Sequence, residues 1–228
     1  MDIKAKICAF LNKYKHSRVF LYALIYVPCF MWLEGNVTNK YYVIHSSVDD
    51  LIPFVEYFII PYFLWFAFMA VWGLYFFFTS AEDFLKLAKL TIAGMTIFLL
   101  ISAVIPNGLM LRPEMFERDN VLVDMVKFLY RVDTPTNVFP SLHVFNSLAI
   151  CIAIHESDKL KKHKMVKYVS YIIAVLIILA TMFLKQHSVY DVVMAFIMAC
   201  VIYQFVYVPV ESRAFRFAKN RKVLLGSK

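Results

Sequence analysis

Two histidines and one aspartate in the second half of the chain have the types and spacing of a nucleophilic site. His187 precedes Asp191 by four residues, a separation that places two helical side chains on one face. A carboxylate behind an imidazole fixes which ring nitrogen carries the proton, and it stabilises the charge that forms when the other nitrogen attacks. His143 is a second histidine, which can act as the general acid that protonates a departing oxygen.

Two cations and a serine accompany these residues and indicate an anionic substrate. Arg112 can bind a phosphate through two parallel hydrogen bonds, and Lys185 adds a point charge. Ser141 stands just ahead of a predicted helix, where its hydroxyl joins the free N–H groups of the first turn. Fixed cations and N–H donors are what phosphoryl transfer needs, because its charge spreads over the phosphate oxygens.

The same residues allow plainer interpretations. Two histidines and an aspartate can also bind a metal ion, but Arg112 and Lys185 would repel a divalent cation and no further carboxylate offsets them. We therefore predict no metal site. A His-x-x-x-Asp pair also occurs as a surface ion pair, and His143 taken alone is compatible with a hydrogen-bonded histidine at the end of a membrane segment.

The elements that must position these residues are membrane helices. The chain is 61% hydrophobic and 17% aromatic and carries only 18% charged residues, more apolar surface than a soluble domain can bury. The composition predicts an all-α integral membrane protein with a six-transmembrane-helix bundle, a single membrane domain over 1–228. The six apolar runs are 18–34, 57–79, 87–106, 141–155, 166–184 and 189–209.

The positive charges set the predicted orientation. With the N-terminus in the cytoplasm, 18 of the 24 Lys and Arg residues fall in inner segments, so we expect both termini to be cytoplasmic. Arg112, His143, His187 and Asp191 then meet at the extracytoplasmic side. The net charge of +8 reflects this topology and attraction to lipid headgroups, and it does not indicate nucleic-acid binding.

Three flanking segments complete the predicted organisation. Segment 1–17 is a basic cytoplasmic segment, either an amphipathic helix on the membrane or a solvated tail, and 210–228 is a basic cytoplasmic tail. Between them, outer loop 107–140 contains a stretch, 119–132, with apolar residues on one helical face. We predict a short surface helix there, either a lid over the site or ordinary loop packing. The first apolar run is expected to remain as an anchor, and the four cysteines form no C-x-x-C pair.

Three short motifs resemble a known family. Arg112-Pro113, Pro140-Ser-Leu-His143 and His187-x-x-x-Asp191, in this order, resemble the signature motifs of the type 2 phosphatidic acid phosphatase superfamily. The resemblance covers about residues 105–195 by motif. It implies that His187 becomes phosphorylated while Asp191 holds it, that His143 is the general acid, and that no metal or other cofactor is needed.

The chain departs from the family pattern at two positions. Ile105 stands where the first motif usually has a lysine, and Thr181 stands where the third motif usually has an arginine. Lys185 can replace one of the lost charges. The Pro-Ser-Leu-His form of the second motif is similar to the branch that contains inositol phosphorylceramide synthases and related lipid phosphotransferases.

The resemblance implies a multi-pass membrane enzyme that hydrolyses a phosphomonoester or diphosphate of a membrane lipid. Candidate substrates are phosphatidic acid, phosphatidylglycerol phosphate and a polyprenyl phosphate or diphosphate. One alternative is a lipid phosphotransferase that passes a phosphoryl group or phospho-headgroup to an alcohol. A second is a transporter or scaffold of the same fold without catalysis. A haloperoxidase is disfavoured, because the two oxyanion-binding positions are replaced and the chain is membrane-embedded.

Overall fold

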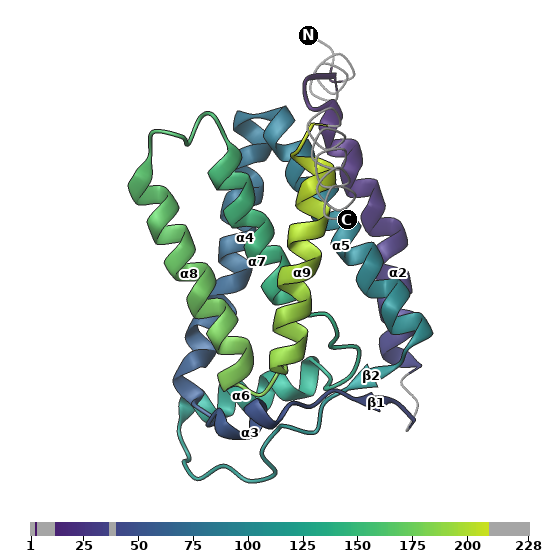
Figure 1. The fold of residues 1–228 in the computed structure, drawn as a ribbon, viewed down its shortest axis with the longest axis vertical. Coiled ribbons are helices and arrows are strands. Elements are labelled where there is room, and N and C mark those ends of the chain that lie inside the picture. Colours follow the sequence, from purple (N-terminus) through teal and green to yellow (C-terminus); the bar gives the residue numbers. More distant parts are fainter. Residues whose placement is uncertain (1–2, 4–11, 37–39, 210–228) are drawn as a thin grey trace, which may run out of the picture.

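The structure is a computed structural model that describes residues 3, 12–36 and 40–209 of the 228-residue chain. Within these residues it is a bundle of helices with two short strands at one end (Figure 1). The elements in chain order are η1 (Lys15–Tyr22), α2 (Ala23–Gly35), β1 (Tyr42–Val43), α3 (Ser47–Leu51), η2 (Glu56–Phe58), α4 (Ile59–Thr79), α5 (Ala81–Val104), β2 (Asn107–Gly108), α6 (Val121–Val132), α7 (Leu142–Glu156), α8 (Lys164–Phe183) and α9 (Val189–Val206).

Within the described residues, five helical stretches are long and apolar enough to cross a membrane, as expected of a multi-pass membrane protein. They are Lys15–Gly35, Glu56–Thr79, Ala81–Val104, Lys164–Phe183 and Val189–Val206. The remaining predicted span, 141–155, corresponds to α7, which has only 15 residues. At about 1.5 Å per residue, α7 is roughly 22 Å long, shorter than the ~30 Å hydrocarbon core.

The sixth span and the cytoplasmic location of the termini therefore stay predictions. The predicted tail 210–228 and most of segment 1–17 lie outside the described residues.

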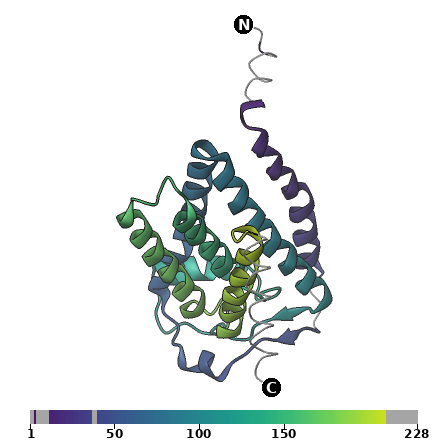
Figure 2. The ribbon, with the colours of Figure 1, turned by 45° about the horizontal axis from the view of Figure 1, so that its top comes forward.

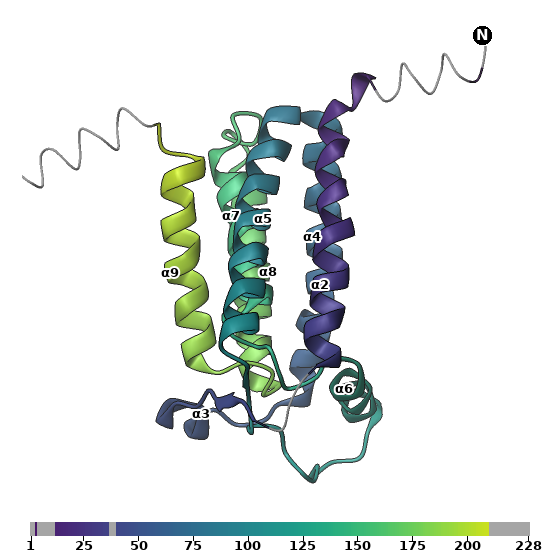
Figure 3. The ribbon, with the colours of Figure 1, turned by 90° about the vertical axis from the view of Figure 1, so that its right-hand side faces the viewer.

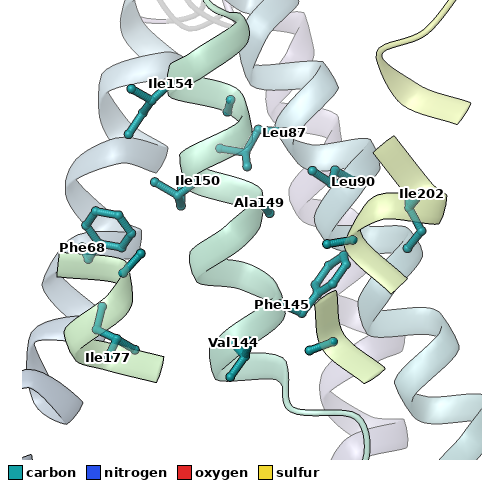
Figure 4. Packing of buried hydrophobic residues seen from close by; sticks show 14 of the residues in the cluster. Phe68, Leu87, Leu90, Val144, Phe145, Ala149, Ile150, Ile154, Ile177 and Ile202 are labelled. Atoms are coloured by element: carbon teal, nitrogen blue, oxygen red, sulfur yellow. The ribbon is translucent and has the colours of Figure 1, made fainter. Parts of the chain in front are cut away.

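Helix α7 lies at the centre of the bundle. Five of its apolar side chains are fully buried: Val144, Phe145, Ala149, Ile150 and Ile154. Side chains from α4, α5, α8 and α9 surround them and include Phe68, Leu90, Ile177 and Ile202 (Figure 4). A Cβ at Gly94 of α5 would lie 2.1 Å from the Phe145 ring, so only glycine allows this close approach. The packing fixes α7, and with it the helix start that carries His143.

Helix α2 lies at the edge of the bundle and is the least enclosed of the long elements. It runs beside α5 (Figures 2 and 3), and none of its residues is buried. The η1 segment that precedes α2 is joined to α5 by a hydrogen bond of 2.7 Å between the hydroxyls of Tyr22 and Thr96. The loose packing leaves room for a cavity between α2 and its neighbours, described below.

The opposite end of the bundle from the α4–α5 turn carries α3, α6 and both strands, and we call it the α6 end (Figure 1). There β1 pairs in parallel with β2. Helix α6 occupies the stretch for which the sequence predicts a surface helix, and it buries Val123, Val126 and Leu129. Its N-terminal side is tied to the buried Glu56, which accepts hydrogen bonds from Arg118 at 3.0 Å and Asn120 at 3.3 Å.

The loop that leads into α7 is tied to β2. Asn107 accepts hydrogen bonds on its side-chain oxygen from the N–H groups of Val138 and Phe139, both at 2.9 Å. A Cβ at Gly108 would lie 2.8 Å from the Pro135 carbonyl oxygen, so glycine allows the two segments to touch. These contacts set the position from which the Pro140–His143 motif enters α7.

Candidate active site

His187 lies in the short connection between α8 and α9, and hydrogen bonds hold its backbone. The N–H groups of Gln186 and His187 both donate to the Thr181 carbonyl, at 2.9 and 3.0 Å. His187 Nδ1 is 3.2 Å from Asp191 Oδ2, and both side chains are buried. The N–H of Ser188 donates to the same carboxylate oxygen at 2.8 Å.

The spacing of His187 and Asp191 suggests that both lie on one face of a helix, but the structure pairs them across a helix start. Ser188 is the N-cap of α9, so His187 precedes the helix and Asp191 is in its first turn. Ser188 and Asp191 form a capping box, in which the carboxylate turns back toward the helix start. This turn brings Asp191 to the imidazole. Its other oxygen, Oδ1, is buried and has no hydrogen-bond partner among the described residues.

His143 is in the first turn of α7 and faces His187. The centres of the two imidazole rings are 5.7 Å apart. The His143 ring also lies against two aromatic rings of α4, those of Tyr62 at 4.8 Å and Trp65 at 4.6 Å. Two segments that are far apart in sequence therefore bring both predicted catalytic histidines to one place at the α6 end.

Ser141 joins the starts of α7 and α9. It is fully buried and is the N-cap of α7, with its hydroxyl oxygen 3.3 Å from the N–H of Val144. Its own N–H donates to the Asp191 carbonyl at 3.3 Å. Ser141 thus contacts the residue that pairs with His187, and its role in phosphate binding stays a prediction.

Arg112 reaches this cluster through Gln186. Its guanidinium donates to the carbonyls of Tyr130 at 3.1 Å and Asp133 at 2.6 Å and to Gln186 Oε1 at 2.5 Å. It also lies 4.4 Å from the centre of the Tyr130 ring, and its buried Nε has no partner among the described residues. Burial lowers the pKa of Arg112, and the charge of Asp133 opposes that shift. Arg112 therefore caps the C-terminal end of α6 and touches the residue next to His187.

Lys185 points toward α3. Its ammonium donates to the main-chain carbonyls of Asp49 at 2.7 Å and Ile52 at 2.5 Å. Burial lowers the pKa of Lys185, while the charge of Asp49 acts in the opposite direction. Among the described residues, the hydrogen bonds of this ammonium go to backbone oxygens and none goes to a residue of the histidine cluster. Its predicted role as a phosphate ligand stays a prediction.

A carboxylate that the sequence analysis did not select also belongs to this region. Asp133 Oδ2 accepts hydrogen bonds from the Tyr62 hydroxyl at 2.8 Å and from Gln186 Nε2 at 3.0 Å. Asp133, Gln186 and Tyr62 line a cavity together with both histidines. Only the position of Gln186 beside His187 hinted at its involvement. Nothing in the sequence pattern marked Asp133 or Tyr62. Tyr62 is on α4 and Asp133 follows α6, and the two come together only in the folded chain.

The cavity has a volume of about 560 Å³ and lies between helices at the edge of the bundle. Two carboxylates, Asp133 and Glu34, line it together with both histidines. The other polar side chains in its lining are Thr134, Thr136, Asn137, Asn146 and Gln186. Its other walls are mainly apolar side chains from α2, α4, α5 and α6, among them Tyr26, Phe30, Phe63, Phe66, Met95, Phe98, Phe128 and Leu129. Such a space suits an amphipathic molecule with one polar end and one apolar end. Within the described part of the chain, no three His, Cys, Asp or Glu residues are grouped to hold a metal ion.

Comparison with known proteins places the motif-bearing part of the chain in a family. The profile of the PAP2 superfamily matches residues 108–214. The chain is also similar to the uncharacterized protein MJ0662 of Methanocaldococcus jannaschii, with 23% identity over 176 residues that cover 76% of this chain and 69% of that protein. No solved structure matches the chain. The part of the chain that carries Arg112, both histidines and Asp191 thus belongs to the PAP2 superfamily, a family made up generally of phosphatases.

Proposed function

We propose that this protein is a membrane lipid phosphatase that hydrolyses a phosphomonoester or diphosphate of a membrane lipid through a phosphohistidine intermediate, without a metal ion. One observation carries the proposal. His187, whose ring pairs with Asp191, and His143 line one cavity, and most of the other side chains that line it are apolar. Membership of the PAP2 superfamily supports the reaction class.

The hydrogen bond to Asp191 assigns the two nitrogens of His187. A carboxylate can only accept, so we assign Nδ1 as the donor to Oδ2 of Asp191, and Nε2 then keeps its lone pair and attacks the phosphorus atom. The bond between phosphorus and the lipid oxygen breaks, and His143 gives that oxygen its proton. Water then attacks the phosphohistidine, His143 takes a proton from the water, and phosphate leaves with His187 restored. The Asp191 carboxylate stabilises the positive ring that forms in the first step.

Arg112 is the cation that we assign to the phosphate. Its Nη2 already contacts Gln186 Oε1 next to His187, and a phosphate oxygen can replace that amide oxygen as the acceptor. Ser141 supplies its hydroxyl near the start of α7. Lys185 would first have to release two carbonyls of the α3 region, so its contribution to phosphate binding is the smaller one.

The lipid enters from the side in this proposal. Helix α2 is exposed along its length, and its residues form one wall of the cavity, so a hydrocarbon chain can pass from the bilayer between α2 and α4. The positive-inside rule favours the extracytoplasmic leaflet for this entry. A cysteine introduced in place of the exposed Met115 should then react with an impermeant maleimide from outside intact cells. Labelling that requires permeabilised cells would place the site inside.

Asp133 favours one alternative, a phosphotransferase. Its carboxylate lines the cavity and contacts the neutral donors Tyr62 and Gln186, and within the described residues it forms no ion pair. A negative group there repels a doubly charged phosphomonoester and can accept a hydrogen bond from the hydroxyl of an alcohol. The alternative enzyme would pass a phosphoryl group or phospho-headgroup to that alcohol instead of to water.

A screen of lipid phosphates tests the proposal. Purified protein in detergent is given phosphatidic acid, phosphatidylglycerol phosphate and polyprenyl phosphates, each with and without chelator. A phosphatase releases inorganic phosphate from at least one of them with chelator present, and His187→Ala abolishes the release. His155→Ala is the matched control, because His155 pairs with Tyr171 away from the cavity that holds His143 and His187. Product formation that depends on an added alcohol, with little free phosphate, supports the transferase instead.

A further inference from the structure

A buried carboxylate of α3 contacts the residues that follow His187. Asp49 is 2% exposed, and its side chain accepts three hydrogen bonds. The donors are the N–H of Ser46 at 2.8 Å, the hydroxyl of Ser188 at 2.6 Å and the N–H of Val189 at 2.8 Å. The first bond belongs to the capping box of α3 itself. The other two join α3 to the start of α9, about 140 residues away.

The same region also contacts the residues that precede His187. The Lys185 ammonium donates to the carbonyls of Asp49 and Ile52, and the N–H of Val55 donates to the Phe183 carbonyl at 3.1 Å. Lys185 has a φ of 54°, a left-handed conformation that a lysine seldom adopts. Residues 49–55 therefore hold the α8–α9 connection on both sides of His187.

Ser188 is the link between Asp49 and the catalytic pair. Its hydroxyl donates to Asp49 and its N–H donates to Asp191, so two carboxylates from different parts of the chain hold one residue. Ser188 directly follows His187. Any shift of Ser188 changes the distance of 3.2 Å between the His187 ring and Asp191, on which the orientation of the imidazole depends.

We infer that Asp49 is a positioning residue for His187. It holds Ser188 and Val189 in place, and this keeps the His187 ring at hydrogen-bond distance from Asp191. The inference rests on the proposed role of His187 as the nucleophile. It assigns a function to α3, a helix of five residues that lines neither the cavity nor the histidine cluster. Neither Asp49 nor Ser188 lines the cavity, so their loss should lower kcat and leave KM nearly unchanged.

Alanine variants of the full-length protein in detergent test this inference, with ³²P-labelled phosphatidic acid as the probe. Asp49→Ala and Ser188→Ala should each lower kcat by roughly 10–10²-fold, the loss that a small misplacement of a catalytic group causes. The loss in the double variant should be smaller than the product of the two single losses, because the two residues share the hydrogen bond between Ser188 and Asp49. Asp50→Ala is the matched control, since Asp50 is on the same helix and its exposed side chain pairs with His45.

Hydrogen–deuterium exchange provides a readout that needs no activity. In Asp49→Ala and Ser188→Ala the amides of 186–188 should exchange about 10-fold faster than in the wild type, and in Asp50→Ala they should not. Faster exchange limited to Val189, or losses in kcat that multiply in the double variant, would overturn the inference. If Asp49→Ala does not fold, Asp49→Asn takes its place, because an asparagine has the same shape, keeps one side-chain oxygen as an acceptor and loses the other. The proposed function and the positioning role can fail separately. If the wild type forms no phosphoenzyme but the amides of 186–188 still exchange faster in the variants, the proposed function is contradicted and the positioning role of Asp49 is retained.

Discussion

His187 Nδ1 and Asp191 Oδ2 are 3.2 Å apart, and the same carboxylate oxygen closes the capping box of α9 through the N–H of Ser188. One side chain therefore serves both the helix start and the imidazole. The N–H of Ser188 holds the Asp191 carboxylate in place, and the carboxylate in turn holds the His187 ring in place.

The first prediction concerns Asp191→Asn. An asparagine still accepts a hydrogen bond from Ser188, so the helix start is kept. An oxygen in the place of Oδ2 can also still accept from Nδ1, but the negative charge that stabilises the positive ring of His187 is lost. We expect kcat to fall by up to about 10⁴-fold, as when the orienting carboxylate of a catalytic triad becomes an amide. Steady-state kinetics and the melting temperature in detergent measure the two effects separately. A normal kcat would contradict the role of Asp191, and Asp50→Asn controls for the loss of a carboxylate at the α6 end.

The second prediction separates the roles of the two histidines by leaving group. His143→Ala should slow turnover of a lipid phosphate by roughly 10²–10⁴-fold, the usual contribution of a general acid. An activated ester such as p-nitrophenyl phosphate leaves without a proton, so its turnover should fall much less. Equal losses for both substrates would contradict the assignment of His143 as the acid. His155→Ala should change neither rate.

The third prediction distinguishes Arg112 from Lys185. A charged hydrogen bond contributes about 1.5–3 kcal/mol, so Arg112→Ala should weaken inhibition by vanadate by roughly 10–10²-fold. Lys185→Ala should leave vanadate affinity nearly unchanged and lower kcat, because its ammonium holds the α3 carbonyls. A larger loss of vanadate affinity in Lys185→Ala than in Arg112→Ala would show that the lysine is the main phosphate ligand. Arg112→Lys tests whether the charge alone suffices, since a lysine cannot make the forked contacts of the guanidinium.

Much of the helical architecture could be predicted from the sequence, because membrane helices need long apolar runs. The positions of α4, α5, α8 and α9 follow from composition, although α5 begins at Ala81, ahead of the predicted run 87–106. Its polar first turn is capped by Ser80, whose hydroxyl accepts from the N–H of Asp83 at 3.2 Å. Hydropathy does not detect a polar helical turn at a membrane surface, so it missed this extension.

The candidate site was predictable only in part. The motif residues His143, His187, Asp191 and Ser141 do meet, since each lies at or near a helix start at the α6 end. The direction in which a long side chain points could not be predicted in the same way. Sequence proximity to His187 suggested that Lys185 faces the same group, but its left-handed backbone turns the ammonium toward α3.

The contributions of Asp133 and Asp49 come from pairings between distant segments. The backbone of Asp133 is held beside the cavity by a hydrogen bond from Arg112 to its carbonyl. Asp49 contacts the start of α9 through the hydroxyl of Ser188. Neither aspartate belongs to one of the three family motifs, and the capping box that Asp49 forms with Ser46 accounts only for its contact within α3. Such contacts can be found only once the chain is folded, because nothing local to either residue encodes its partner.

Trapping of the phosphoenzyme tests the central claim most directly. Wild-type protein, His143→Ala and His187→Ala are mixed with a ³²P-labelled lipid phosphate, quenched in alkali and analysed by mass spectrometry of the labelled peptide. We expect an acid-labile phosphate on the peptide that contains His187 in the wild type, slower labelling in His143→Ala, and no label in His187→Ala. Label that still accumulates in His187→Ala would show that another residue is the nucleophile and would contradict this account.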